Sequence, residues 1–416
     1  MREDLYRTVW RWHFYAGLIV LPFLAWLAVT GGLYLYKPEI EGALYRSWSA
    51  ASGPAMAIAP MIGQVEDETG ARVASVMRPA EVDASWRMTL EGDNGRRLAF
   101  VDPANGHVLG TTRDGGTMAL VKNLHSLAIT GPIGNALIEI AAGWTILLVA
   151  TGFYLWWPRG GNPAVAVRGR PAGRLFWRDL HASTGAIVGA VILFLAVTGM
   201  PWSGVWGEGL RAVVAHYGIG RPKAPNPDHG DHRAALPWAL QEVASPHAGH
   251  HAAIGPDRVI AIAGMAAPWQ LVPPKAMGQP WLVASVVTRA EDARAVYVDP
   301  ASGAVLADMR FGQFGAGAKA VEWGIAVHQG QEYGEANRFV MLLGCVAALL
   351  LCVTAPVLWW KRRFATPPRP SDPARARGVA AIMLVAGLIF PLTGATMLAA
   401  LLGEKIMTVA FRRRTG

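Results

Sequence analysis

The stretch HFYAGLIVLPFLAWLAVTGGLYLY, residues 13–36, decides the fold class, because it is apolar over the full thickness of a bilayer. It is too long for the apolar part of a cleaved signal peptide, so we expect it to be retained. Further apolar runs lie near 135–157, 182–206, 338–360 and 378–402. The sequence therefore predicts a multi-pass α-helical membrane protein.

The composition favours the same class. Of the 416 residues, 52% are hydrophobic and 16% are charged, whereas soluble proteins carry roughly 25% charged residues. The 17 tryptophans and the apolar content exclude a disordered chain. The net charge is +9, but the basic residues flank apolar runs instead of forming a stripe on a soluble domain. We therefore expect membrane lipid around the chain and no nucleic-acid partner.

Clusters of Lys and Arg set the predicted orientation. They lie before the first run, between the second and third, and between the fourth and fifth. Because cytoplasmic loops carry an excess of Lys and Arg, we expect a cytoplasmic N-terminus and two large outer loops. The predicted segments are a first helix (1–36), an outer domain with an amphipathic segment (37–134), a second helix (135–157), a basic loop (158–181), a third helix (182–206), an outer domain with a His-rich insertion (207–337), a fourth helix (338–360), a basic loop (361–377), a fifth helix (378–402) and a basic tail (403–416).

Short motifs recur along the chain. LAVTG at 27–31 recurs at 195–199, and DPANG at 102–106 recurs as DPASG at 299–303. Alternating apolar and polar residues flank each Asp-Pro-x-x-Gly turn, a pattern typical of strands. The recurrence indicates a parallel internal duplication, in which the unit helix, α+β domain, helix occurs twice and a fifth helix follows.

Four histidines occupy matching positions in the two repeats. His13 and His181 begin apolar runs at the cytoplasmic face, and His125 and His328 lie in amphipathic segments at the outer face. Taken singly, each is explained as an interfacial residue. As two symmetric pairs they indicate ligands, because ionisable side chains near hydrocarbon are costly and imidazole is a common iron ligand.

The spacing of these histidines predicts two haem sites. The two axial ligands of one iron lie within a few ångströms across it, and a core about 30 Å thick prevents pairing an inner with an outer histidine. Symmetry then pairs His13 with His181 and His125 with His328. No CxxCH occurs, so both groups would be non-covalent haem b.

Other residues near the inner pair could support such a group. Gly17 and Gly185 each lie four residues after a histidine, on the same helix face, where a macrocycle could approach the backbone. Arg11 and Arg178 either pair with propionates or only determine the topology.

The remaining candidate residues have weaker links to chemistry. The histidines of the second outer loop either form a tract able to bind metal or belong to a solvated loop. Cys345 and Cys352 fit small packing residues better than redox thiols. The histidines of that tract are His216, His229, His232, His247, His250 and His251.

The RWHFYAG opening at 11–17, the LxxTG that closes the first run, the DPxxG turns and the paired helix–domain–helix layout resemble PepSY-associated transmembrane proteins. The resemblance covers about 1–363. It implies a bacterial inner-membrane location and two periplasmic α+β PepSY-like domains. Some members are similar to ferric-siderophore reductases that carry haem on histidines, which implies that His13, His125, His181 and His328 are the ligands.

The function expected from this resemblance is that of a membrane haem-dependent reductase. It would pass electrons to a ferric siderophore in the periplasm and release Fe(II). No flavin- or NAD-binding segment occurs, so the electrons would come from a separate cytoplasmic or quinol donor. Two alternatives stay open: a non-catalytic PepSY module that binds a peptide or protein, and a transporter whose histidines relay protons.

Overall fold

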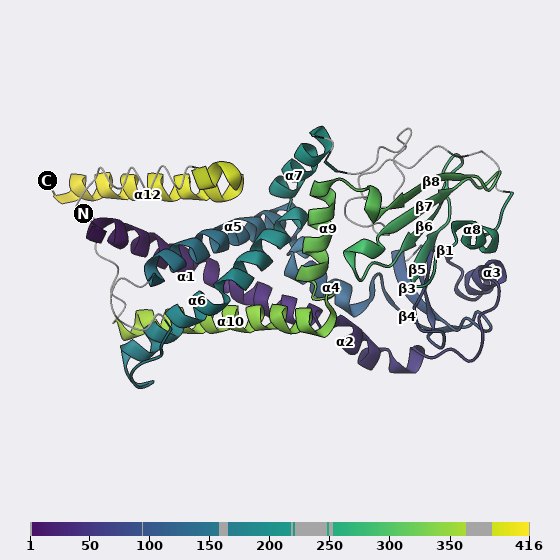
Figure 1. The fold of residues 1–416 in the computed structure, drawn as a ribbon, viewed down its shortest axis with the longest axis horizontal. Helices are drawn as coiled ribbons and strands as arrows, with labels where there is room; N and C mark the ends of the chain where they lie inside the picture. Colours follow the sequence, from purple (N-terminus) through teal and green to yellow (C-terminus); the bar gives the residue numbers. More distant parts are fainter. Residues whose placement is uncertain are drawn as a thin grey trace. The chain divides into compact units, whose positions relative to one another are not determined.

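The structure is a computed structural model that describes residues 2–93, 95–157, 165–217, 219–220, 248, 253–362 and 385–415. The chain divides into two compact units (Figure 1). The first comprises Met1–Leu35, Lys122–Arg211 and Glu335–Gly416, and the second comprises Tyr36–Val121 and Ala212–Gly334. Long helices dominate the first unit, and the second carries the β-sheet.

Four helices of the first unit are long and apolar enough to cross a membrane. This confirms the expectation of a multi-pass helical membrane protein. A short helix η2 (Ala128–Thr130) leads into the second of them, and η3 (Met200–Trp202) follows the third. The four helices are α1 (Arg2–Tyr34), α5 (Gly131–Trp156), α6 (Arg174–Gly199) and α10 (Gly334–Lys361).

The expected fifth span differs from the observed helix. The expectation was 378–402, of which 378–384 lie outside the described residues. A short helical segment at 385–389 ends at Phe390, and helix α12 (Pro391–Thr415) begins one residue later. Its apolar part, Pro391–Gly403, is too short to count among the candidate spans, and the basic tail expected at 403–416 continues the same helix. Pro391 explains the start, because proline fits the first turn of a helix.

Small residues bring the helices of the first unit together. A Cβ added at Gly344 of α10 would lie 2.8 Å from Val191 of α6, and one added at Gly189 would lie 3.1 Å from Phe153 of α5. Such close approach is typical of membrane helix interfaces. Cys345 packs in a buried cluster with Ala28 and Ile192, as expected for a packing residue.

The second unit contains an eight-stranded antiparallel sheet. Helix α2 (Lys37–Leu44) and η1 (Arg46–Trp48) precede α3 (Ile58–Thr69), and α8 (Pro256–Ala263) precedes the second set of strands. The strands are β1 (Arg72–Arg78), β2 (Trp86–Gly92), β3 (Gly95–Val101), β4 (Val108–Arg113), β5 (Trp269–Val272), β6 (Trp281–Ser285), β7 (Arg294–Val298) and β8 (Val305–Arg310). The remaining elements of the two loops are α4 (Gly116–His125), α7 (Val205–His216), η6 (Ala290–Asp292), η7 (Phe311–Gln313) and α9 (Ala316–His328).

The two outer loops share this one sheet, whereas the sequence was interpreted as two separate domains. The strand order is β4-β3-β2-β1-β5-β6-β7-β8, so each loop contributes a meander and the two meanders join where β1 pairs with β5. An unpaired β1 or β5 would expose a sheet edge, which joining removes. Asp257 of α8 also accepts hydrogen bonds from the Ile58 and Ala59 backbone N–H groups at the start of α3, at 2.6 and 3.0 Å.

Helices α3 and α8 cover one face of the sheet and share a core with it. Met61 and Val65 of α3 are fully buried there, as is Val259 of α8. The Asp-Pro-x-x-Gly turns have the structural role that the sequence predicts. Gly106 and Gly303 end them at φ values of 76° and 77°, a conformation that favours glycine.

Candidate functional site

His13 lies in the α1 span, where its Nδ1 is 2.9 Å from the hydroxyl oxygen of Thr151 on α5. Thr151 directs its own hydroxyl hydrogen to the Leu147 carbonyl one turn earlier, at 2.7 Å. A hydroxyl has one hydrogen to donate and lone pairs to accept with. Because that hydrogen is used within α5, the Thr151 oxygen accepts and His13 Nδ1 donates.

His181 repeats this arrangement between the other two spans. Its Nδ1 is 2.7 Å from the hydroxyl oxygen of Thr354 on α10. Thr354 donates to the Leu351 carbonyl of its own helix, at 3.1 Å. The imidazole on one helix and the hydroxyl on the next therefore form the same pair twice in the first unit.

His125, at the end of α4, makes a third such pair. Its Nδ1 is 2.9 Å from the hydroxyl oxygen of Thr30 on α1, and Thr30 donates to the Trp26 carbonyl at 2.7 Å. The Trp26 indole in turn donates to the Leu124 carbonyl at 2.7 Å, which fixes the end of α4 against α1. Burial lowers the pKa of His125 to about 4, against a smaller opposing effect of the Leu27 carbonyl.

These contacts select one tautomer at His13 and His181. When Nδ1 carries the proton of a neutral imidazole, Nε2 keeps its lone pair. A metal-ligating histidine ordinarily donates its other ring N–H to an oxygen, which fixes the ring and raises its basicity as a ligand. His13 and His181 thus meet the requirement for Nε2 ligation of iron, whereas the His125 ring also contacts the Leu27 carbonyl.

The sequence reasoning missed the threonines and the glycines that follow two of them. A Cβ added at Gly152 would lie 3.3 Å from His13 Cε1, and one added at Gly31 would lie 3.2 Å from His125 Cε1. Each glycine therefore lets an imidazole approach the helix that supplies its acceptor. A signal was available, because Thr-Gly or Thr-Ala occurs at matching positions in all four spans: 30–31, 151–152, 198–199 and 354–355.

The predicted inner pair is close in space. His13 and His181 lie near enough to each other to interact electrostatically. Gly185, one turn after His181, has open space where a Cβ would stand, and a Cβ at Gly17 would meet only Leu148 Cδ2, at 3.9 Å. Two imidazoles with available Nε2 atoms and two bare glycine surfaces fit a flat group held between the helices.

The predicted propionate partners already have contacts of their own. Arg178 donates to the Asp179 carboxylate at 2.7 Å, and Arg168 donates to the same carboxylate. Arg11 lies over the Tyr15 ring, with its Cζ 5.6 Å from the ring centroid. Arg178 would therefore have to share its guanidinium between Asp179 and any second carboxylate.

His328 belongs to a different compact unit from the other three histidines. It is the last residue of α9 and belongs to the second unit, whereas His13, His125 and His181 belong to the first. Its side chain is half-buried. The predicted pairing of His125 with His328 therefore stays a prediction.

Clusters of metal-binding side chains are not found among the described residues: none groups three or more His, Cys, Asp or Glu. A haem iron needs only two protein ligands, so such a cluster is not required for the predicted site. His216 ends α7, and the rest of the His-rich tract, His229, His232, His247, His250 and His251, lies outside the described residues.

Glu139 is an intramembrane carboxylate that the sequence reasoning also missed. It is buried in α5 and accepts hydrogen bonds from the Val205 and Trp206 backbone N–H groups at the start of α7, at 2.9 and 3.2 Å. Both oxygens cap a helix N-terminus, where a negative charge is stabilised. Its role is therefore structural, and it fixes the turn after α6 to α5.

Comparison with known protein families identifies the family of this chain. Residues 10–362 match the family described as the PepSY-associated TM region. No curated protein matches the sequence. The match covers most of the chain, including α1, α5, α6, α10 and the whole sheet, so this protein belongs to the PepSY-associated transmembrane family.

Proposed function

We propose that this protein is a di-haem oxidoreductase of the bacterial inner membrane that reduces a ferric chelate, such as a ferric siderophore, on the periplasmic side. The observation that carries the proposal is the repeated pair of an imidazole Nδ1 and a threonine hydroxyl at His13, His125 and His181. At His13 and His181 the pair leaves Nε2 as the ligand atom.

Two features support two haem b groups over one. The matching positions of His13 and His181, and of His125 and His328, follow from a parallel duplication of the unit helix, outer domain, helix. His125 is held near the end of α1 by Thr30, and His13 lies four turns or more away near its start. When bound, the two groups would supply one-electron transfer between the two faces of the membrane.

The residues of the chain have defined tasks in this proposal. Thr151, Thr354 and Thr30 accept the Nδ1 protons and so hold the rings. Gly152 and Gly31 admit the rings to the helix surface. Burial keeps His125 neutral at physiological pH, because its pKa of about 4 lies far below 7.

The orientation and the substrate follow from charge and from iron chemistry. The basic segments before α1, between α5 and α6 and after α10 favour the cytoplasmic side, which supports a periplasmic position for the segments that form the sheet. One electron converts Fe(III) into Fe(II), which the hard oxygen ligands of a chelate hold less well. The donor would be a separate cytoplasmic protein or a quinol.

The test is a single-turnover reaction with the full-length protein in detergent. The protein is loaded with haem, reduced with dithionite, freed of excess reductant and mixed with ferrioxamine in the presence of ferrozine, which traps Fe(II). We expect Fe(II) to form at the rate at which the haem absorption returns to the oxidised spectrum. His181→Ala should abolish the reaction, and His107→Ala, which changes an exposed histidine paired with Glu68, should not.

Two results would contradict the proposal. Protein that holds haem but does not deliver electrons to any ferric chelate is no ferric reductase. Folded protein that takes up no haem supports instead a peptide-binding module or a proton-coupled transporter.

A further inference from the structure

Two arginine pairs occupy equivalent places in the two halves of the sheet. Arg97 of β3 lies directly opposite Arg113 of β4, and Arg294 of β7 lies directly opposite Arg310 of β8. The two pairs are separated along the chain by the same spacing as the DPANG and DPASG turns. Like charges directly opposite each other destabilise a sheet, so a neutralising partner stabilises each pair.

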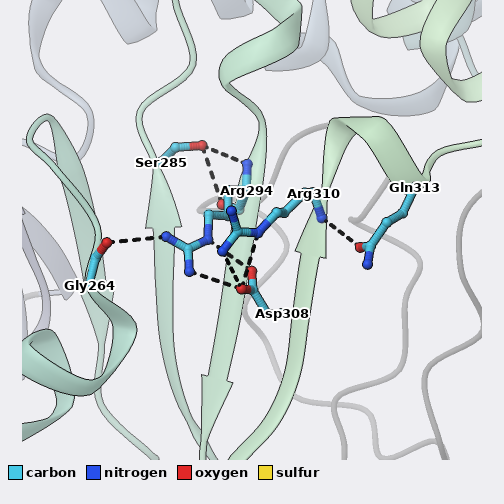
Figure 2. Close-up of polar contacts among 6 residues, drawn as sticks. All are labelled: Gly264, Ser285, Arg294, Asp308, Arg310 and Gln313. Atoms are coloured by element: carbon cyan, nitrogen blue, oxygen red, sulfur yellow. Dashed lines mark hydrogen bonds and ion pairs between the residues drawn. The ribbon is translucent and has the colours of Figure 1, made fainter.

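In the second half, Asp308 is that partner (Figure 2). Its carboxylate accepts from Arg294 Nε and a terminal nitrogen at 2.8 and 2.9 Å, and from Arg310 at 2.8 and 3.2 Å. The three side chains come from one face of β7 and β8, since Asp308 lies two residues before Arg310 and opposite Val296. One carboxylate thus bridges both guanidinium groups.

In the first half, the bridging position is uncharged. The residue two before Arg113 is Thr111, opposite Ala99, which matches the position of Asp308. Within the described part of the chain, no hydrogen bond or ion pair joins the side chain of Arg97 or of Arg113 to another residue. Asp114, the carboxylate next to Arg113 in the chain, pairs instead with Arg96.

We propose that Arg97 and Arg113 form a binding site for a small carboxylate ligand, whose carboxylate takes the place that Asp308 occupies in the other half. Arg97 is half-buried and Arg113 is exposed, so a soluble ligand can reach the pair. The planar guanidinium fork binds a carboxylate in a bidentate manner, and the matching position in the other half is occupied by the carboxylate of Asp308. Thr111 places no carboxylate between the two arginines, and its hydroxyl can donate a hydrogen bond to the ligand.

This inference is independent of haem, and its test uses citrate as the probe. The full-length protein is titrated with citrate by calorimetry at constant ionic strength, with inorganic phosphate as a second arm. We expect saturable binding of one citrate per chain. Arg97→Ala should weaken it about tenfold or more, because it removes a charged hydrogen-bond donor, and Thr111→Ala should retain binding.

Two further variants test whether citrate binds at the position that corresponds to Asp308. Thr111→Asp supplies the bridging carboxylate from within and should abolish citrate binding while preserving the fold, since it restores the arrangement of the second half. Asp308→Ala should open the second pair and raise the stoichiometry from one citrate to two.

Three results would overturn the inference. Citrate could fail to bind at matched ionic strength, or Thr111→Asp could bind it as the unchanged protein does. Phosphate binding without citrate binding would contradict a carboxylate site.

Discussion

His13 on α1 donates a hydrogen bond from Nδ1 to the hydroxyl of Thr151 on α5 at 2.9 Å, and His181 and Thr354 form the same pair between α6 and α10. In each case the threonine hydrogen is directed to a carbonyl of its own helix. The tautomer of both rings is therefore a consequence of helix packing, and Nε2 keeps the lone pair with which it could bind iron.

Replacing Thr151 by Val should weaken haem retention at the inner site by about 10–100-fold and raise the midpoint potential. The reason is that an imidazole that donates its N–H is a more basic ligand, which favours Fe(III). A spectroelectrochemical titration measures the potential. Thr151→Ser should restore it, because serine keeps the acceptor oxygen.

The matched control for this prediction is Thr145, also on α5. Its hydroxyl is buried and donates to the Ala141 carbonyl of the same helix. Thr145→Val should leave the potential unchanged. Equal shifts from Thr145→Val and Thr151→Val would show a general packing effect and no role of the His13 contact.

Replacing Gly152 by Val should remove haem from the inner site while the outer site stays loaded. Even the Cβ of alanine would stand 3.3 Å from His13 Cε1, a tight contact, and the methyl groups of valine add to it. The haem content per chain, measured by the pyridine haemochrome absorbance, should fall by half. Gly209→Val is the control, because its Cβ meets nothing within 4 Å.

Gly31→Val should have the complementary effect at the outer site, since its Cβ would stand 3.2 Å from His125 Cε1. If Gly152→Val or Gly31→Val retained both haem groups, the close approach of the imidazole ring to the helix backbone would have no role in holding haem.

Replacing Glu139 by Leu should lower the stability of the membrane unit by about 0.5–2 kcal/mol, because α7 loses its N-terminal cap when the backbone N–H groups of Val205 and Trp206 lose their acceptor. Glu139→Gln keeps one acceptor oxygen and should cost less. Thermal unfolding in detergent measures both. The exposed Glu208 provides the control, and a Glu208→Gln variant as unstable as Glu139→Leu would contradict the capping role.

Asp308 should give the sheet an acid-sensitive contribution to stability. Hydrogen bonds from Arg294, and to a lesser degree Arg310, hold the pKa of Asp308 below its ordinary value, against the effect of burial. The contribution is therefore complete above about pH 4 and is lost as the pH falls below it. Asp308→Asn should flatten the acid limb of the unfolding curve, whereas Glu291→Gln, at an exposed position, should leave that limb in place.

The membrane helices were predictable because bilayer thickness sets the length of an apolar run. The 13–36 run and the runs near 135–157, 182–206 and 338–360 correspond to helices that can span a membrane. The fifth run at 378–402 lies partly outside the described residues, and hydropathy alone does not show that a new helix begins at Pro391 within it. The turns at Asp102 and Asp299 followed from local chemistry, in which Pro and Gly fix the backbone.

The single sheet and the threonine acceptors were not predicted, because both depend on contacts between distant segments. In the pairing of β1 with β5, Val76 lies opposite Leu271. The alternation of apolar and polar residues within one strand does not show which other strand lies beside it. Likewise, Thr151 looks like an ordinary residue of an apolar helix until His13 is placed against it. The four histidines were found from their repetition, which the threonines share.

The central claim is that His13 and His181 hold one haem and that His125 holds a second. Its most direct test is the haem content and low-temperature EPR spectrum of the purified full-length protein, alongside His13→Ala, His181→Ala, His125→Ala and the exposed control His107→Ala. We expect two low-spin, bis-histidine haem b groups per chain in the unchanged protein and in His107→Ala. We expect loss of one and the same signal in His13→Ala and His181→Ala, and loss of the other in His125→Ala. Folded protein without haem, or different signals lost in His13→Ala and His181→Ala, would contradict it.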